Sequence, residues 1–154
     1  MRLLYGHSRD VIAFVNERLP QEENFAGCEA VGVINKDGLL VAGWVWHNHS
    51  PEAQVIEFSG AADTPRWMTR KILHEIFAHA FDRLGCQMIA TRNSGNNTRL
   101  HRQLAAYGFD RHQIPRLFGR NEDGVVWTLT DDQWRQSRFE KRVARGQENT
   151  ASCA

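Results

Sequence analysis

The spacing of apolar residues along the chain switches between the period of a helix and the period of a strand. A helix is predicted over residues 9–19, where one face is apolar: Val11, Ile12, Val15 and Leu19. Strands are predicted over 30–34 and 39–46, and a short apolar run at 3–5 adds another. The turn Asn35-Lys36-Asp37-Gly38 contains an Asp-Gly pair, which is typical of a tight hairpin.

The middle of the chain is predicted to organise the fold around one long helix. A strand over 54–58 is followed by a break over 59–62. The helix then begins at Thr64, which can cap it, and Pro65, which suits the first helical position, and it runs to Leu84. Its apolar residues form one arc of about half the circumference, the face expected to pack on a sheet: Ile72, Leu73, Ile76, Phe77, Ala80, Phe81 and Leu84.

A strand over 86–91 completes a strand–helix–strand crossover, whose two strands are expected to be parallel. A loop over 92–96 is predicted to lead to a helix over 97–107 that ends at Gly108. A strand over 109–118, a turn over 121–124 and a strand over 125–129 follow, and a last helix begins at 130. The sequence therefore predicts an α+β fold, a mixed sheet of about six or seven strands with helices on both faces and one parallel crossover. Residues 1–141 are expected to form a single domain, and the polar residues 142–154 a disordered tail.

Composition narrows the class of protein. The 154 residues are 42% hydrophobic and 24% charged, which is ordinary for a globular domain. A net charge of +1 argues against a surface that binds polyanions in bulk. The three cysteines are scattered, as expected of free thiols in a reducing compartment, and no apolar run approaches the length of about 18 residues that a membrane span needs. With no signal-peptide pattern at the N-terminus, a cytoplasmic protein without membrane contact is expected.

The charges at the start of the long helix oppose the helix dipole. Arg66, Arg70 and Lys71 stand where a partly positive helix end favours acidic residues. Such cations are reasonable if an anion lies among them, because free backbone amides and basic side chains together form a phosphate site. A solvated basic edge explains the same residues, and both interpretations stay open.

Two pairs of histidines invite a metal interpretation. His74 and His79 are five residues apart, so on a helix they point about 140° apart and cannot share an ion. His47 and His49 alternate with Asn48 and are expected to share one strand face. No third ligand with suitable spacing accompanies them, so no metal site is expected, and the two are interpreted as solvent-facing or substrate-side histidines.

The order of elements and two local patterns resemble the GNAT superfamily of N-acetyltransferases over residues 2–140. The first pattern, Asn97 to Phe109, is similar to an Asn that precedes a Gly-Phe pair by eleven residues in that family. The second, Asp123 to Trp134, resembles the closing strand and helix of the ribosomal-protein-acetyltransferase-like and phage-encoded branches.

The resemblance implies that acetyl-CoA enters a cleft where the fourth and fifth strands splay apart. The cofactor-binding residues implied are Phe58, Ser59, Gly60, Arg66, Trp67, Met68, Thr69, Arg70, Lys71 and Asn97. In the family's phosphate motif, Arg66 keeps its place, but Thr69 and Lys71 replace small residues. The family's tyrosine acid falls at Leu104, so that Tyr107 and Ser94 are the nearest substitutes.

The expected reaction is transfer of an acetyl group from acetyl-CoA to a primary amine of a protein N-terminus, a lysine or a small molecule. Glu57 is the candidate base, directly or through water, with His47 and His49 as alternatives, and the backbone N–H near Phe58 is expected to polarise the thioester carbonyl, as in the family.

Two other functions stay open. The altered phosphate motif and the missing tyrosine also suit a catalytically inactive binding module of the same fold. The basic residues near the C-terminus also suit a nucleic-acid-directed protein: Arg135, Arg138, Lys141, Arg142 and Arg145. Whether two copies associate into a homodimer is left open.

Overall fold

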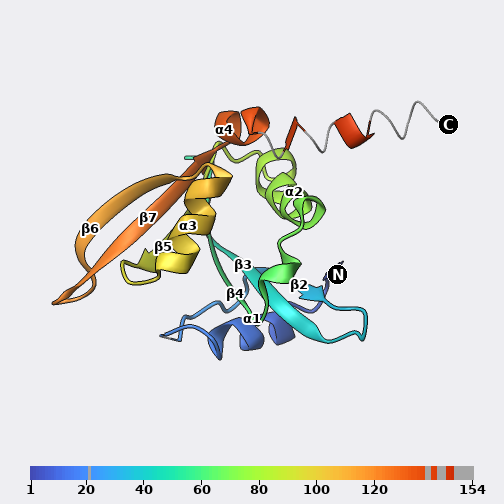
Figure 1. Cartoon of the computed structure of the whole chain (residues 1–154), viewed down its shortest axis with the longest axis horizontal. Coiled ribbons are helices and arrows are strands. Elements are labelled where there is room, and N and C mark those ends of the chain that lie inside the picture. Colours follow the sequence, from blue (N-terminus) through green and yellow to red (C-terminus); the bar gives the residue numbers. More distant parts are fainter. Residues whose placement is uncertain (21, 138–139, 142–144, 148–154) are drawn as a thin grey trace.

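A single mixed sheet runs through the computed structural model, which describes residues 1–20, 22–137, 140–141 and 145–147 (Figure 1). The strands are β1 Arg2–Leu4, β2 Glu29–Ile34, β3 Leu40–Ser50, β4 Val55–Ala62, β5 Met88–Ser94, β6 Asp110–Gly119 and β7 Glu122–Thr130. Their order across the sheet is β1-β2-β3-β4-β5-β7-β6, and β4 and β5 are the parallel pair. The predicted mixed sheet with one parallel crossover is confirmed.

Helices pack on both faces of the sheet, as predicted. They are α1 Ser8–Asn16, α2 Arg70–Ala78, α3 Thr98–Tyr107 and α4 Asp131–Gln136. On one face, α1 buries Val11 and Val15 against strand residues such as Val45. On the other face, α2 and α3 contribute Phe77 and Leu104 to a larger core. Among the described helices, none is long and apolar enough to cross a membrane.

The long helix predicted from Thr64 to Leu84 is interrupted at both ends. Pro65–Trp67 form a separate 3-10 turn capped by Thr64, and Met68 leaves the helical conformation. Thr69 then caps α2, its hydroxyl accepting a hydrogen bond from the Ile72 N–H at 3.3 Å. The last turn, His79–Arg83, is a π-helix. The prediction of one continuous helix was therefore wrong, because a second capping residue restarts it.

Several predicted boundaries move because strand pairing extends further than the local pattern indicates. The expected break over 59–62 is part of β4, which stays paired with β3 as far as Ala62. In the same way β5 continues into the predicted loop as far as Ser94. Strand β7 begins at Glu122, inside the predicted turn. The end of α3 is confirmed, because Gly108 adopts the left-handed conformation with φ 114°.

The predicted C-terminal tail falls mostly outside the described residues. The expectation of disorder concerned 142–154, of which 142–144 and 148–154 are not described, while 145–147 are helical.

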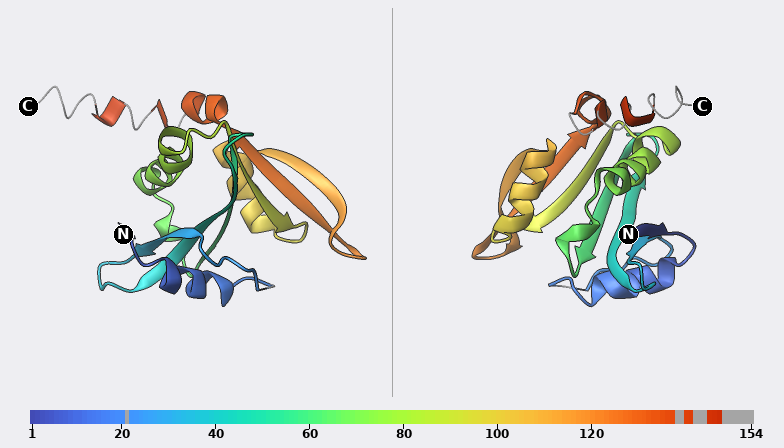
Figure 2. Two further views of the ribbon diagram at one scale, coloured as in Figure 1. Left: turned by 180° about the vertical axis from the view of Figure 1, so that it is seen from behind. Right: turned by 45° about the vertical axis from the view of Figure 1, so that its right-hand side comes forward.

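The sheet opens between β4 and β5. The two strands pair at three positions, Val55 with Met88, Ile56 with Ile89 and Glu57 with Ala90. They then diverge towards their carboxyl ends, as the right-hand view of Figure 2 shows. Beyond Glu57, β4 is paired with β3 on one edge only. The predicted divergence is confirmed, and it begins one residue earlier on each strand than expected.

Candidate active site

A cavity of about 770 Å³ occupies the opening between β4 and β5. Side chains from both faces of the sheet line it, including Phe77 of α2 and Leu104 of α3 on one face and His47 and Glu57 on the other. The loop after α1 forms a further wall with Leu19, Pro20, Glu22, Glu23 and Asn24. The cavity therefore reaches both faces of the sheet at the point where its two halves separate.

A group of polar side chains lies on the α1 face of this cavity. Antiparallel pairing sets His47 opposite Glu57, and the His47 Nε2 lies 2.9 Å from the Ser59 Oγ. From β5, the Arg92 Nε lies 3.6 Å from the Glu57 Oε2. The neighbours Ile56 and Phe58 point the other way and are buried in the core beneath α2. Strand alternation thus gathers the polar groups on one side, as predicted for Glu57 and Ser59.

The buried position of His47 lowers the pKa of its imidazole below the ordinary value of 6.5. Desolvation is the largest cause, and the charges of Glu57 and Glu23 oppose it. The ring packs against Phe25 with centroids 5.1 Å apart, and the residue is only 9% exposed. His47 is therefore neutral at neutral pH and able to accept a proton on a ring nitrogen.

His49 does not share the face of His47, contrary to the prediction. Asn48 has a positive φ of 50°, and the pairing of β3 with β4 shifts between His47 and Ser50. This bulge breaks the alternation on which the prediction rested. His49 is exposed and is not among the residues that line the cavity.

The two substitutes for the missing tyrosine acid, Tyr107 and Ser94, both line the cavity. Tyr107 packs edge-to-face on Phe77 at 5.0 Å, and burial, followed by the charge of Glu140, raises the pKa of its phenol well above the ordinary value. A phenol in this environment is a weak proton donor. The hydroxyl of Ser94 donates a hydrogen bond to the carboxylate of Glu122.

The predicted cofactor residues divide into two groups. Six of them line the cavity: Phe58, Ser59, Gly60, Trp67, Met68 and Asn97. Four others are exposed: Arg66 in the 3-10 turn, and Thr69, Arg70 and Lys71 at the start of α2. Within the first group, Asn97 also caps α3, its side chain accepting a hydrogen bond from the Leu100 N–H at 3.3 Å.

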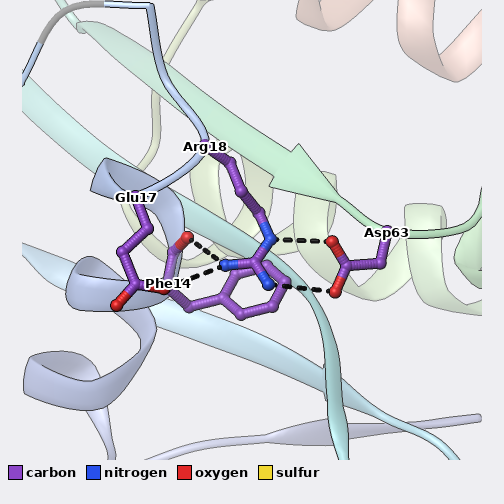
Figure 3. Close-up of polar contacts among 4 residues, drawn as sticks. All are labelled: Phe14, Glu17, Arg18 and Asp63. Carbon is purple, nitrogen blue, oxygen red and sulfur yellow. Dashed lines mark hydrogen bonds and ion pairs between the residues drawn. The ribbon is translucent and has the colours of Figure 1, made fainter.

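An arginine that the sequence analysis did not single out joins the end of α1 to the end of β4 (Figure 3). Arg18 donates two hydrogen bonds to the Asp63 carboxylate, at 2.7 and 3.1 Å, and one to the Phe14 carbonyl at 2.9 Å. It holds the pKa of the Asp63 carboxyl below its usual value. Both residues line the cavity, and no sequence signal connects them because they are 45 positions apart.

Comparison with solved structures identifies the architecture. A spermidine N-acetyltransferase SpeG chimera from Vibrio cholerae and hSSAT aligns with a TM-score of 0.73 at 13% identity, covering 87% of this chain and 99% of that one. A ribosomal-protein alanine acetyltransferase from Vibrio fischeri aligns with a TM-score of 0.67 at 13% identity, covering 86% and 93%. The chain has the GNAT acetyltransferase fold. No family model and no curated protein matches the sequence.

The GNAT fold accounts for the position of the cavity. In an open sheet, ligands commonly bind beyond the carboxyl ends of parallel strands, and the parallel strands of this sheet are β4 and β5. Arg92 is a second residue that the sequence analysis missed. Arg92 lies two positions after Ala90, which is the last residue of β5 paired with β4 and is paired with Glu57. Strand alternation therefore puts Arg92 on the same face as Glu57. This relation depends on the register of the two strands.

Proposed function

We propose that this protein is an N-acetyltransferase that transfers an acetyl group from acetyl-CoA to a primary amine by direct attack. The observation that carries the proposal is the cavity between two diverging parallel strands, with His47, Glu57 and Ser59 gathered on one of its faces. Solved proteins of the same fold are named as acetyltransferases for spermidine and for a ribosomal protein, which supports this reaction class.

The residues around the opening fit acetyl-CoA. The edge of β4 from Phe58 to Ala62 is paired with β3 alone, so its other edge faces β5 across the opening with backbone groups for an amide-containing chain. The start of α2 offers the partial positive charge of a helix end together with the basic side chains of Arg70 and Lys71, and Arg66 lies in the 3-10 turn that precedes it. Phe58, Trp67 and Met68 would hold the apolar part, and the helix start would hold the phosphates.

Acetyl-CoA would supply a thioester. An acceptor that enters as an ammonium first loses one proton to a base. The neutral nitrogen then bonds to the thioester carbonyl carbon, the C–S bond breaks, and a second proton leaves the nitrogen while the thiolate gains one. The chain's own groups have to take up and supply these protons. Glu57 is the base that we propose, because it occupies the last position at which β4 pairs with β5 and its side chain remains 28% exposed. His47, buried behind the Ser59 hydroxyl, is the alternative base.

Tyr107 is the residue that we propose as proton donor to the thiolate, because it lines the cavity near Phe77 and Phe109. Its raised pKa keeps the phenol protonated at neutral pH and makes it a weak acid. Solvent that enters the open side of the cavity can supply the same proton.

The proposal is tested by following acetyl-CoA-dependent release of free thiol with a panel of amines: an alkylamine, a diamine, lysine and a short peptide with a free N-terminus. We expect at least one amine to raise thiol release well above hydrolysis. We also expect acetyl-CoA to raise the melting temperature, because a ligand that binds only the folded state stabilises it. Absence of amine-dependent release over the whole panel would contradict the proposal.

A binding module that holds CoA without catalysis is the second candidate. The observation that favours it is the environment of Tyr107, whose raised pKa makes it a poor acid, together with Leu104 at the family's tyrosine position. This function predicts a melting-temperature shift with CoA but no thiol release with any amine.

A nucleic-acid-directed role stays a prediction, and of the basic C-terminal residues on which it rested, Lys141 and Arg145 are exposed. Arg138 and Arg142 lie outside the described residues. Arg135 is engaged within the protein, with an ion pair to Asp82 at 3.0 Å and its guanidinium 5.3 Å from the Trp134 ring centroid.

A further inference from the structure

Arg92 brings a positive charge to the two candidate bases. It lies on the α1 face of the opening, with its Nε 3.6 Å from the Glu57 Oε2. Its charge also adds to the larger effect of burial in lowering the pKa of His47. A single cation therefore acts on both groups that are able to take a proton from an acceptor amine.

The ion pair between Arg92 and Glu57 is weak enough for another cation to replace Arg92. The distance of 3.6 Å exceeds that of a hydrogen bond, and the two side chains are 47% and 28% exposed. Arg18, in the same cavity, is different: it is fixed by two hydrogen bonds to Asp63 and one to a backbone carbonyl. Within the described chain, Glu57 is the ion-pair partner of Arg92, so another cation can replace the arginine at little cost.

We propose that Arg92 occupies the place of the acceptor's ammonium group in the free protein. The entering amine displaces Arg92 from Glu57, and Arg92 returns when the amine has become an amide. This inference rests on the proposed function. The physical reason is that an alkylamine is a cation at neutral pH, whereas its N-acetyl product is neutral and cannot compete with a guanidinium for a carboxylate. The exchange of charges thus lowers the affinity for the entering amine somewhat and favours release of the neutral product.

The test compares wild type with Arg92→Gln by calorimetry, in the absence of acetyl-CoA, using pentylamine and N-pentylacetamide as probes. We expect Arg92→Gln to bind pentylamine about fivefold more tightly, because an exposed ion pair no longer has to be broken, and to bind the neutral amide as wild type does. Arg92→Lys, which keeps the charge, should resemble wild type. Arg9→Gln removes an exposed charge outside the cavity and serves as the matched control.

In turnover, the same exchange predicts that Arg92→Gln lowers the KM for the amine about fivefold. Equal or weaker amine binding by Arg92→Gln, including no detectable binding by either protein, would overturn the inference. Failure of the proposed function looks different, because thiol release would then be absent in wild type while the effect on amine binding remained.

Discussion

At the scale of single residues, the two candidate bases Glu57 and His47 differ in how exposed their side chains are to the cavity. The carboxylate of Glu57 is open to the cavity and contacts Arg92, while the imidazole of His47 is almost fully buried and contacts the Ser59 hydroxyl. A base that meets the acceptor directly has to be accessible, which favours Glu57.

Glu57→Gln keeps the size and polarity of the side chain but removes its capacity to accept a proton. We expect turnover to fall by roughly 10²–10⁴-fold while the affinity for CoA, measured by calorimetry, stays the same. Glu52→Gln, at an exposed turn position outside the cavity, is the matched control and should leave the rate unchanged. Turnover of Glu57→Gln within a factor of two of wild type would assign the proton to His47 or to water.

His47 makes stability depend on pH. Because burial lowers its pKa in the folded state below 6.5, the folded protein resists protonation of this ring more than the unfolded chain does. Its contribution is therefore fully present above about pH 6.5 and is lost as the pH falls through the lowered pKa. We expect the unfolding free energy, measured in urea, to decline less steeply below pH 6.5 in His47→Gln than in wild type. The same dependence of the unfolding free energy on pH in the two proteins would show that burial does not lower the pKa of His47 in the folded state.

At the scale of elements, the start of α2 differs from that of a helix with a glycine-rich opening. The Thr69 hydroxyl already accepts a hydrogen bond from the Ile72 N–H, so this amide is not available to a phosphate. The cations Arg66, Arg70 and Lys71 are left to contribute the attraction for an anion, together with the remaining helix end.

Replacing Arg66, Arg70 and Lys71 together by Ala should weaken CoA binding by about tenfold or more, because charge-assisted contacts to phosphate are strong. Stability should stay the same or rise slightly, since two of the three cations, Arg70 and Lys71, leave a positive helix end. Acetyl-pantetheine, which lacks the nucleotide phosphates, is the control ligand, and its affinity should not change. Unaltered CoA affinity in the triple variant would assign these residues to a solvated edge.

Thr69→Gly should have the opposite effect on the cofactor. The change frees the Ile72 N–H for a phosphate oxygen, and we expect CoA to bind up to about tenfold more tightly in calorimetry. Glycine is an acceptable N-cap, so the unfolding free energy should fall by only about a few tenths of a kcal/mol. A variant that binds CoA no better would show that the phosphates do not approach this amide.

At the scale of the whole molecule, the sequence predicted what depends on local patterns. The crossover between β4 and β5 followed from one amphipathic helix between two apolar runs, and the end of α3 followed from Gly108. Contacts that depend on register or tertiary folding were missed, namely the Glu57–Arg92 and Arg18–Asp63 pairs. The bulge at Asn48, which separates the two histidines, was missed as well, although Asn is a residue type that tolerates a positive φ.

The central claim is that an amine and acetyl-CoA react in the opening between β4 and β5. The most direct test is to count, by mass spectrometry and a thiol assay in the same sample, the N-acetylated amine formed and the CoA thiol released. The account predicts equal amounts of the two products, both lost together in Glu57→Gln. Thiol release without an acetylated amine, or binding of acetyl-CoA with neither product, would contradict it.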